Sequence, residues 1–275
     1  MIRACIFDLG GTIVDKYSLT PFLSLKEAFA FKKISVFQDL LQKDMGLRKI
    51  DHIDRILKDK KIIHQWKNIH GKKPDDNDKY DIYDNFHKCQ LINQRKNMEV
   101  IPQAYKCLKK LKNNNIKIGI TTGFSKPITD DIIDLFNLEN YINHYVSSSC
   151  LDYPGRPHPF MINENMKVLK IDNPKHIIKI DDTCTGIREG KNAGCWTVGV
   201  ARWSVNMGVS SINELNDMNQ LMYNEENCYG NYRILRDKID KSKDILKSEN
   251  PDYVIQTLEE LPSVINIINN KLKIF

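Results

Sequence analysis

The sequence predicts an α/β fold in which a doubly wound parallel sheet carries one all-helical insertion. Two observations predict this class. Short runs of β-branched apolar residues recur along the chain with helical periodicity between them, which is typical of a parallel sheet covered by helices on both faces. One long stretch, residues 18–98, has helical periodicity and contains no strand-like run.

The strands are expected where isoleucine, valine and aromatic residues stand together in short runs. These runs are Ile2–Phe7, Ile116–Thr121, Tyr145–Ser148, Ile177–Ile180, Thr197–Val200 and Tyr253–Ile255. Helices are expected between them at Pro102–Lys112, Pro127–Phe136, Phe160–Leu169 and Gly186–Ala193. The core domain is therefore predicted to consist of residues 1–17 and 99–275.

Residues 18–98 are predicted to form a helical cap domain, inserted after the first strand. Its expected helices are Leu25–Phe31, Phe37–Lys43, Met45–Leu57, Ile62–Asn68 and Asn77–Leu91. The chain is expected to cross between the domains near Tyr17–Pro21 and again near Gln94–Ile101. An insertion of this kind beside an active site often acts as a lid that expels water.

Composition excludes several classes of protein. With 275 residues, 41% of them hydrophobic and 28% charged, the chain can bury a core and is not disordered. No apolar run approaches the roughly 18 residues of a membrane span, and no signal-peptide pattern opens the chain. The net charge of +6 is dispersed, so neither a nucleic-acid surface nor a membrane is an expected partner. The polar stretch Glu225–Asn250 is expected to be a solvated helix and loop.

The seven cysteines have no CxxC pair and no zinc-ligand spacing. An odd, scattered set is typical of reduced thiols in a reducing compartment. A cytoplasmic protein without disulfides is therefore expected. Cys184, although it lies beside a polar cluster, is expected to be a small buried residue.

Four polar clusters fall where predicted strands end or in the loops that follow them. They are Asp8-Leu9-Gly10-Gly11-Thr12, Thr121-Thr122-Gly123, Gly155-Arg156-Pro157 and Asp181-Asp182-Thr183. Each cluster alone is commonly structural, for instance as a turn or a helix cap. Ligands of parallel sheets bind beyond the carboxyl ends of the strands, so the four together indicate an active site.

In this order the clusters resemble the four motifs of the haloacid dehalogenase (HAD) superfamily. The resemblance implies a Rossmann-like core with a helical cap, Asp8 as a nucleophile and Mg²⁺ as a cofactor. Many members carry a second aspartate two residues after the first, which protonates the leaving group, but here that position is Gly10. An alkoxide leaving group needs such a proton, so ordinary phosphate-ester hydrolysis is disfavoured.

A motif in the predicted cap narrows the resemblance to one family within the superfamily. Residues 45–52 read Met-Gly-Leu-Arg-Lys-Ile-Asp-His, which is similar to the Met-Gly-Leu-x-Lys-x-Asp-His motif of the phosphonoacetaldehyde hydrolase (phosphonatase) family. That family also carries a small residue at the Gly10 position. The similarity continues through residues 117–123, 155–157 and 189–200. It therefore covers nearly the whole chain.

The spacing within this motif suggests how its side chains lie. On a helix beginning near Met45, the side chains of Met45, Lys49 and His52 share one face. Asp51 and Arg55 would pair on another face. The resemblance places Met45 and His52 close to the reacting group on Lys49.

The resemblance implies that Lys49 forms a Schiff base with phosphonoacetaldehyde while Asp8 attacks phosphorus. Breaking a carbon–phosphorus bond leaves an electron pair on carbon, and a protonated imine accepts that pair as an enamine. A lysine must lose its proton to attack, although its ordinary pKa is about 10.4. Burial and neighbouring cations are expected to lower the pKa of Lys49.

The other site residues would hold the metal and the phosphoryl group. The expected Mg²⁺ ligands are Asp8, the Gly10 carbonyl and Asp182. Asp181 is expected to contact these ligands and not the metal itself. The residues expected around the phosphoryl group are Gly11, Thr12, Thr122, Gly123 and Arg156.

Two alternative functions stay open: a Mg²⁺-dependent HAD phosphatase acting on a small phosphate ester, and a phosphate-binding relative without activity. Phe124 and Ser18 stand where relatives can carry tyrosine and cysteine, and Gly186 lacks a carboxylate found in some of them. These departures leave the identity of the aldehyde substrate open. The resemblance also implies a homodimer formed through the cap helices.

Overall fold

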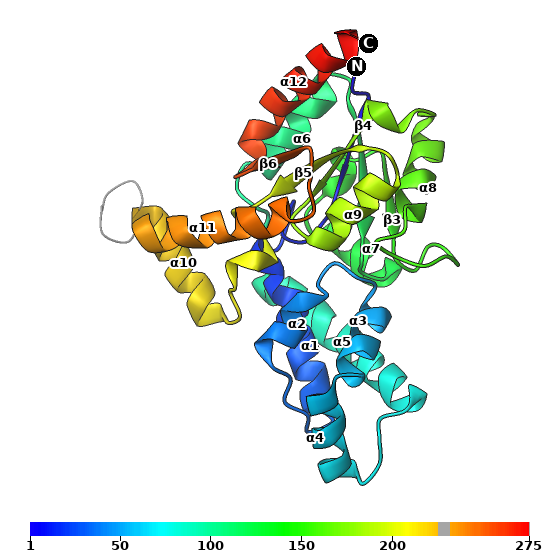
Figure 1. Ribbon diagram of the computed structural model, residues 1–275, viewed down its shortest axis with the longest axis vertical. Helices are drawn as coiled ribbons and strands as arrows, with labels where there is room; N and C mark the ends of the chain where they lie inside the picture. The colour runs from blue at the N-terminus through cyan, green and yellow to red at the C-terminus, as the bar shows by residue number, and fades with distance from the viewer. Residues whose placement is uncertain (225–231, 275) are drawn as a thin grey trace.

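A computed structural model describes residues 1–224 and 232–274 of the chain (Figure 1). Its centre is a six-stranded sheet with the order β3-β2-β1-β4-β5-β6, in which every neighbouring pair is parallel. The strands are β1 (Ala4–Phe7), β2 (Lys117–Thr122), β3 (His144–Ser147), β4 (Ile177–Asp181), β5 (Trp196–Val200) and β6 (Tyr253–Ile255). This order is that of a doubly wound, Rossmann-like sheet, so the predicted fold class is confirmed.

Helices cover both faces of the sheet because alternate residues of its strands point to opposite sides. On β1, Ile6 packs in a cluster with Ile162, whereas Phe7 packs in the cluster that contains Leu108. The core helices are α6 (Ala104–Asn113), α7 (Lys126–Leu135), α8 (Phe160–Leu169), α9 (Cys184–Asn192) and α12 (Leu261–Ile274). All four side chains of β1 are buried, as expected of a central strand.

A second lobe of helices lies between β1 and α6 in sequence and below the sheet in Figure 1. Its helices are α1 (Leu19–Ala30), α2 (Gln38–Lys43), α3 (Lys49–Leu57), α4 (Lys60–His70) and α5 (Asp76–Asn97). Local sequence fixes several of their ends. Asp75 and Asp78 form a capping box at the start of α5, and Gly71 ends α4 with a left-handed φ of 72°.

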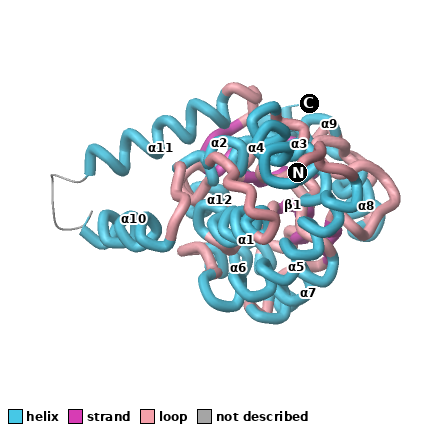
Figure 2. The backbone as a smooth tube through the Cα atoms, turned by 90° about the horizontal axis from the view of Figure 1, so that it is seen from below, coloured by secondary structure: helices cyan, strands magenta, loops and turns pink. Residues whose placement is uncertain are grey.

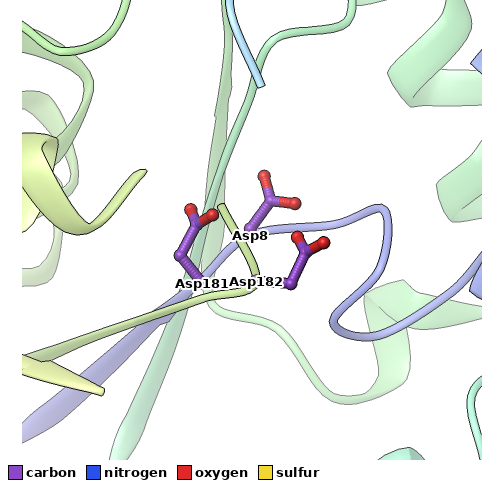
Figure 3. A group of neighbouring side chains, drawn as sticks. All are labelled: Asp8, Asp181 and Asp182. Atoms are coloured by element: carbon purple, nitrogen blue, oxygen red, sulfur yellow. The ribbon is translucent and has the colours of Figure 1, made fainter. Parts of the chain in front are cut away.

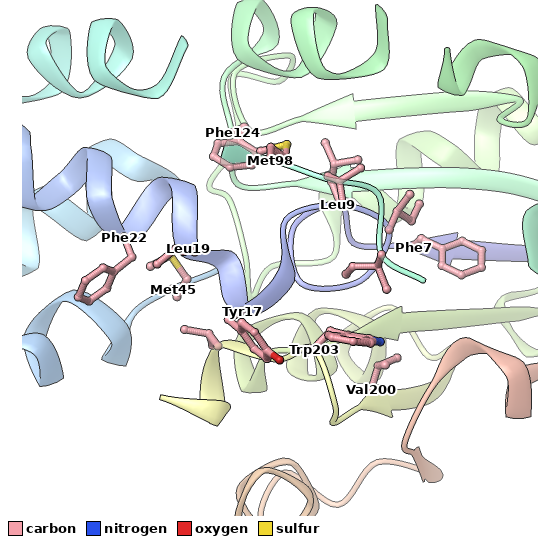
Figure 4. Packing of buried hydrophobic residues seen from close by; sticks show 14 of the residues in the cluster. Phe7, Leu9, Tyr17, Leu19, Phe22, Met45, Met98, Phe124, Val200 and Trp203 are labelled. Atoms are coloured by element: carbon pink, nitrogen blue, oxygen red, sulfur yellow. The ribbon is translucent and has the colours of Figure 1, made fainter. Parts of the chain in front are cut away.

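The two chain crossings between the lobes lie side by side. The amide of Asp15 in the first crossing donates to the carbonyl of Glu99 in the second, at 2.8 Å. Next to it, Tyr17 packs on Trp203 of the core with ring centroids 6.0 Å apart (Figure 4). Tyr17 and Ser18 have left-handed backbone angles, with φ of 65° and 50°, so the first crossing is a tight turn into α1.

Two helices between β5 and β6 project from the body as an arm (Figures 1 and 2). They are α10 (Ile212–Asn224) and α11 (Tyr232–Lys247). The polar stretch expected to be a helix and loop overlaps α11, while its residues 225–231 lie outside the described residues. Neither α10 nor α12 was among the predicted helices.

One predicted helix begins at a different residue from the one expected. The helix expected over Met45–Leu57 begins at Lys49, because Gly46 has a φ of 93° and the segment before Lys49 runs as a loop. A left-handed glycine breaks helical hydrogen bonding, and apolar spacing does not reveal it.

In the part of the chain that the structure describes, no helix is long and apolar enough to cross a membrane. The six described cysteines are Cys5, Cys89, Cys107, Cys150, Cys184 and Cys195, and all are free thiols. Cys184 is half-buried, not buried as expected. The seventh cysteine, Cys228, lies outside the described residues.

Candidate active site

The sheet order brings the predicted clusters together. β1 lies between β2 and β4, so Asp8 after β1 stands between Thr122 at the end of β2 and Asp181 at the end of β4. Ligands of such sheets bind at the strand ends where the winding direction reverses, which here is at β1 and β4. The strand-end motifs therefore share one edge of the sheet.

Three buried carboxylates meet at this edge. One oxygen from each of Asp8, Asp181 and Asp182 lies within 4.8 Å of the others, and all three side chains project to the same side of the strand ends (Figure 3). Gly11 makes this approach possible. Its φ is +71°, and a Cβ at this position would lie 2.3 Å from Oδ2 of Asp182. Gly11 thus makes room for an aspartate rather than merely allowing a turn.

The two neighbouring aspartates at the end of β4 have different surroundings. Oδ1 of Asp181 accepts hydrogen bonds from the amide and hydroxyl of Thr183 at 2.9 and 2.7 Å, and Oδ2 lies 3.0 Å from Nζ of Lys179. Burial opposes its ionisation, but Lys179 and Arg156 outweigh burial and hold its pKa below the ordinary value. Both oxygens of Asp181 therefore have partners in the protein, Oδ1 through hydrogen bonds and Oδ2, which accepts no hydrogen bond among the described residues, through ion pairs with Lys179 and Arg156.

Asp182, in contrast, keeps one oxygen without a partner. Its Oδ2 accepts from the amide of Val205 at 3.0 Å, whereas its buried Oδ1 has no hydrogen-bond donor among the described residues. Burial, and then the charges of Asp8 and Asp181, raise the pKa of Asp182 well above its ordinary value. An orphaned carboxylate oxygen beside a second carboxylate is what a hard divalent cation would complete, so the residues present fit Mg²⁺.

Two buried cations balance these carboxylates. Nη1 of Arg156 lies 2.8 Å from Oδ1 of Asp8, and its Nε donates to Glu189 at 2.9 Å. Nζ of Lys179 lies 3.3 Å from the same Glu189 oxygen and donates to Oγ1 of Thr121 at 2.7 Å. We call the set Asp8, Thr121, Arg156, Lys179, Asp181, Asp182 and Glu189 the charged floor.

Sequence reasoning assigned no role to three members of the charged floor: Thr121, which lies in a predicted polar cluster, Lys179 and Glu189. A signal for Lys179 was available, because it is a lysine in the middle of the buried strand Ile177–Asp181. A charge there needs a buried partner of opposite sign. Nothing in the sequence shows that this partner includes Glu189 of α9, since that contact depends on how α9 packs on the sheet.

Neighbouring charges limit how far burial raises the pKa of Asp8. Burial raises the pKa of Asp8 to about 6, Arg156 lowers it, and Asp181 raises it again. A carboxylate with this pKa is largely ionised at neutral pH and can act as a nucleophile.

The loop that precedes α3 closes the site from the cap side. A Cβ on Gly46 would lie 2.8 Å from Oγ1 of Thr183, and one on Gly123 would lie 2.4 Å from the carbonyl oxygen of Leu47. Both contacts join the cap loop to a core loop that carries a motif. Backbone contact as close as this requires glycine, so these two glycines allow the cap to close tightly.

This closed arrangement buries Lys49, whose side chain is 4% exposed. Its Nζ lies 3.4 Å from Sδ of Met45 and 5.7 Å from the ring centroid of Phe124. Burial lowers the pKa of Lys49 to about 8, against the opposing pull of Asp8. We call Met45, Lys49 and Phe124 the amine pocket.

A small cavity of about 20 Å³ lies between the amine pocket and Asp8. Its lining includes six of the predicted site residues: Asp8, Gly10, Met45, Lys49, Thr122 and Gly123. Ser18 and Phe124 line it as well. The volume is sufficient for a water molecule, and the contacts at Gly46 and Gly123 hold the cap loop against the core.

Other predicted site residues lie away from this cavity. The amide of Gly11, expected to bind a phosphoryl oxygen, instead donates to the carbonyls of Val14 and Asp15 at 2.8 and 3.0 Å. Oγ1 of Thr12 is buried and without a partner among the described residues. The turn after β1 therefore uses the Gly11 amide to hold its own shape.

The shared helical face expected for Met45, Lys49 and His52 is also wrong. Met45 precedes α3 and reaches Lys49 from the loop, while Nε2 of His52 lies 3.4 Å from the carbonyl oxygen of Leu40. Burial, and then the charge of Lys49, lower the pKa of His52 to about 3, so its ring is neutral. His52 does not line the cavity.

The expected pair of Asp51 with Arg55 does not form. Asp51 pairs with Arg48, whose Nε lies 2.9 Å from Oδ2, and Arg55 pairs with Asp44. Arg48 directly precedes α3 and stands three residues before Asp51, a spacing at which side chains are neighbours.

The fold and the strand-end carboxylates are those of one enzyme class, and sequence comparison agrees. The family profile of haloacid dehalogenase-like hydrolases matches residues 5–200. The chain belongs to this family of hydrolases, whose members generally use Mg²⁺.

Its relatives show which branch of this hydrolase family the chain resembles. The chain is 30% identical to a phosphonoacetaldehyde hydrolase of Bacillus cereus over 98% of this chain and 97% of the relative. It is also 30% identical to that of Pseudomonas putida, over 98% of this chain and 94% of the relative. A crystal structure of a phosphonoacetaldehyde hydrolase-like protein from Oleispira antarctica has a TM-score of 0.87 at 27% identity, covering 98% of this chain and 94% of that one. The resemblance read from the motifs, to the phosphonoacetaldehyde hydrolase family, is thereby confirmed.

Proposed function

We propose that the protein hydrolyses the carbon–phosphorus bond of phosphonoacetaldehyde to acetaldehyde and phosphate. The observation that supports this most directly is the shared cavity of Lys49 and Asp8. A buried amine with a pKa of about 8 and a buried carboxylate face the same small space. An amine there can bond to the aldehyde end of a substrate while the carboxylate attacks its phosphorus end.

The first step is formation of an imine. The neutral amine of Lys49 adds to the aldehyde carbon, and a water molecule leaves to give a protonated imine. An oxygen of Asp8 then bonds to phosphorus. The electron pair of the carbon–phosphorus bond moves into the imine, which becomes an enamine.

Two hydrolyses complete the cycle. The enamine takes a proton on carbon, and water releases acetaldehyde from Lys49. A second water attacks the phosphoryl group on Asp8 and releases phosphate. Since the leaving group is a carbon atom that the imine stabilises, no acid is needed at the position of Gly10.

The remaining residues would bind and orient the phosphoryl group. Thr122 and Gly123 line the cavity, and Arg156 lies against Asp8 where negative charge develops. Asp8, the Gly10 carbonyl and Asp182 would hold Mg²⁺, which supplies further charge neutralisation at the phosphoryl oxygens.

Three expectations stay predictions: the protein is a homodimer, it is cytoplasmic, and its partner is a small molecule. Size-exclusion chromatography with light scattering would test the first of them.

Trapping the imine tests the proposal. Phosphonoacetaldehyde and sodium borohydride together should inactivate the wild-type protein and leave an ethyl group on Lys49, detectable by peptide mass spectrometry. Asp8→Asn blocks attack on phosphorus, so it should instead accumulate the phosphonoethyl adduct on the same lysine. This difference separates imine formation from bond cleavage.

Lysine specificity provides the control. Lys49→Arg should give no adduct at any position, including Lys179, which is equally buried but ion-paired. Failure of the wild-type protein to form an adduct would contradict the proposal. Turnover of a sugar phosphate that survives Lys49→Arg would instead indicate the phosphate-ester hydrolase.

A further inference from the structure

Asp182, one of the residues that would hold Mg²⁺, is itself held from outside the four polar clusters. The residue is fully buried, and its Oδ1 has no hydrogen-bond donor among the described residues. An oxygen of this kind binds a metal well only if the rest of its residue is fixed in the right orientation. The contacts that fix Asp182 therefore matter to the metal site.

Those contacts come from the loop that follows β5, residues 201–208, which we call the β5 loop. Three successive residues of this loop donate hydrogen bonds to Asp182. Oγ of Ser204 and Nδ2 of Asn206 donate to its main-chain carbonyl at 2.7 and 3.4 Å, and the amide of Val205 donates to Oδ2 at 3.0 Å. The β5 loop thus holds the backbone and one carboxylate oxygen of Asp182, which fixes the direction of the other oxygen.

Ser204 supports two of these contacts at once. While its hydroxyl donates to the carbonyl of Asp182, the same oxygen accepts from the amide of Asn206 at 3.0 Å. That second bond caps the 3-10 helix Val205–Met207, which presents the amide of Val205 to Oδ2 of Asp182. Ser204 is fully buried, so these two bonds determine where its hydroxyl points.

The β5 loop is in turn fixed by two other parts of the chain. The carbonyl of Trp203 accepts from the amide of Tyr17, in the first crossing between the lobes, at 2.7 Å. The carbonyl of Ala201 accepts from Oγ of Ser242, on α11 of the arm, at 2.9 Å. A group that orients a metal ligand must itself be held, and the β5 loop meets this requirement.

We propose that Ser204 is a positioning residue for the metal: its hydroxyl, and the 3-10 helix that it caps, aim the free oxygen of Asp182 at Mg²⁺. This role rests on the part of the proposed function in which Asp182 holds Mg²⁺, and it does not depend on which substrate is cleaved. Removing a partner that orients a metal ligand commonly weakens metal binding by about 10–100-fold.

The affinity for Mg²⁺ tests this role without substrate. The probe is MgCl₂, titrated into the metal-free full chain and followed by isothermal titration calorimetry. Ser204→Ala should raise the dissociation constant about tenfold or more, whereas Ser204→Thr, which keeps the hydroxyl and can still cap the helix, should stay within about threefold of wild type. Ser204→Cys keeps a weaker donor, so its affinity should lie between those two. An unchanged dissociation constant in Ser204→Ala would overturn the proposal.

Ser242→Ala is the matched control. Ser242 is equally buried, and its hydroxyl also donates to a backbone carbonyl, but that carbonyl belongs to Ala201 and not to Asp182. Urea denaturation of the metal-free proteins should show similar losses of stability for the two alanine variants, while only Ser204→Ala should weaken Mg²⁺ binding. Equal weakening in both would also overturn the proposal, because the affinity would then follow the general stability of the β5 loop.

Asp182→Asn separates this role from the metal site itself. If Asp182→Asn bound Mg²⁺ as tightly as wild type, Asp182 would not be a metal ligand, and both the proposed metal site and the role of Ser204 would be wrong. If Asp182→Asn lost binding while Ser204→Ala kept it, the role of Ser204 alone would be wrong. Neither result depends on whether the protein cleaves phosphonoacetaldehyde.

Discussion

The charged floor and the amine pocket border the same small cavity, and their buried charged groups have opposite surroundings. On the floor, Arg156 and Lys179 lie within 3.5 Å of carboxylate oxygens, so each buried cation has a buried counter-charge. In the amine pocket, Lys49 faces the sulfur of Met45 and the ring of Phe124, so the same degree of burial favours its neutral form.

The comparison shows that two equally buried lysines can have very different surroundings. Lys179 and Lys49 are both buried lysines, yet Lys179 has carboxylate oxygens at 3.0 and 3.3 Å and Lys49 has no ion pair among the described residues. A nucleophilic amine requires the second environment, and a stabilised phosphoryl site requires the first. Removing a charged group from the floor and removing one from the amine pocket should therefore change the free energy of unfolding in opposite directions.

The largest expected effect comes from removing one charge of the floor. Glu189→Gln keeps the size of the side chain but leaves Arg156 and Lys179 with less compensation. Breaking a buried ionic network commonly costs about 3–5 kcal/mol, and we expect a loss of unfolding free energy near the lower limit because Asp8 and Asp181 remain. Urea denaturation measures this loss. We also expect kcat to fall more than KM rises, since Arg156 then neutralises Asp8 more strongly.

The control for this variant is Glu164→Gln. Glu164, which is half-buried at the surface, pairs with the exposed Lys167 at 3.9 Å, and surface pairs contribute about 0–1 kcal/mol. If Glu189→Gln were as mild as Glu164→Gln, the charged floor would not depend on the Glu189 charge.

A gain in stability is expected at the amine pocket. Lys49→Met removes a group whose pKa falls from 10.5 to about 8 on folding, a difference that corresponds to about 3 kcal/mol. At pH 7 both the folded and the unfolded protein hold this proton, so the folded state bears the whole penalty of burying it. We expect Lys49→Met to raise the free energy of unfolding by about 2–3 kcal/mol at pH 7 while losing imine formation.

The pH dependence of that gain supplies its own check. Between pH 8 and 10.5 the unfolded wild-type chain binds the proton and the folded one does not, so wild-type stability rises with pH. The advantage of Lys49→Met should therefore shrink across this range. A constant advantage at all pH values would mean that packing, and not charge burial, is responsible.

The aspartates of the floor were predictable from sequence, because regular structure places them, whereas Thr121, Lys179 and Glu189 were given no role. Once β1, β2 and β4 are recognised as parallel neighbours, Asp8, Thr122 and Asp181 must share an edge. The exceptions are instructive. Gly11 serves Asp182 by leaving space for it, and the partner of Lys179 comes from α9, so both depend on packing that a linear pattern does not contain.

The amine pocket was predicted for the wrong reason. Met45 and Lys49 do meet, but through a loop with Gly46 at a φ of 93° and not along a helix face. Helical spacing fails there because left-handed glycine and contact with Thr183 and Gly123 decide the backbone path. For the same reason the periodicity misplaced His52, which contacts Leu40 instead of the cavity.

The smallest expected effect is a change in the pKa of Lys49 when a charge is placed beside it. Met45→Glu places a carboxylate where Sδ now lies 3.4 Å from Nζ of Lys49, and so gives the amine pocket a feature of the floor. An opposite charge at this distance should raise the pKa of Lys49 by about one unit or more. Since the neutral amine reacts, the midpoint of imine formation should move upward from about pH 8. The rate of borohydride trapping as a function of pH measures it.

Met45→Gln has nearly the same shape without the charge, so its midpoint should stay close to that of wild type. At pH 7, Met45→Glu should react about tenfold more slowly than Met45→Gln, because one pKa unit changes the neutral fraction tenfold. The two variants should converge at high pH, where both amines are neutral. Equal midpoints would show that the Lys49 proton does not respond to its nearest neighbour. A rate difference that persisted at high pH would place the effect in access past Met45 and not in ionisation.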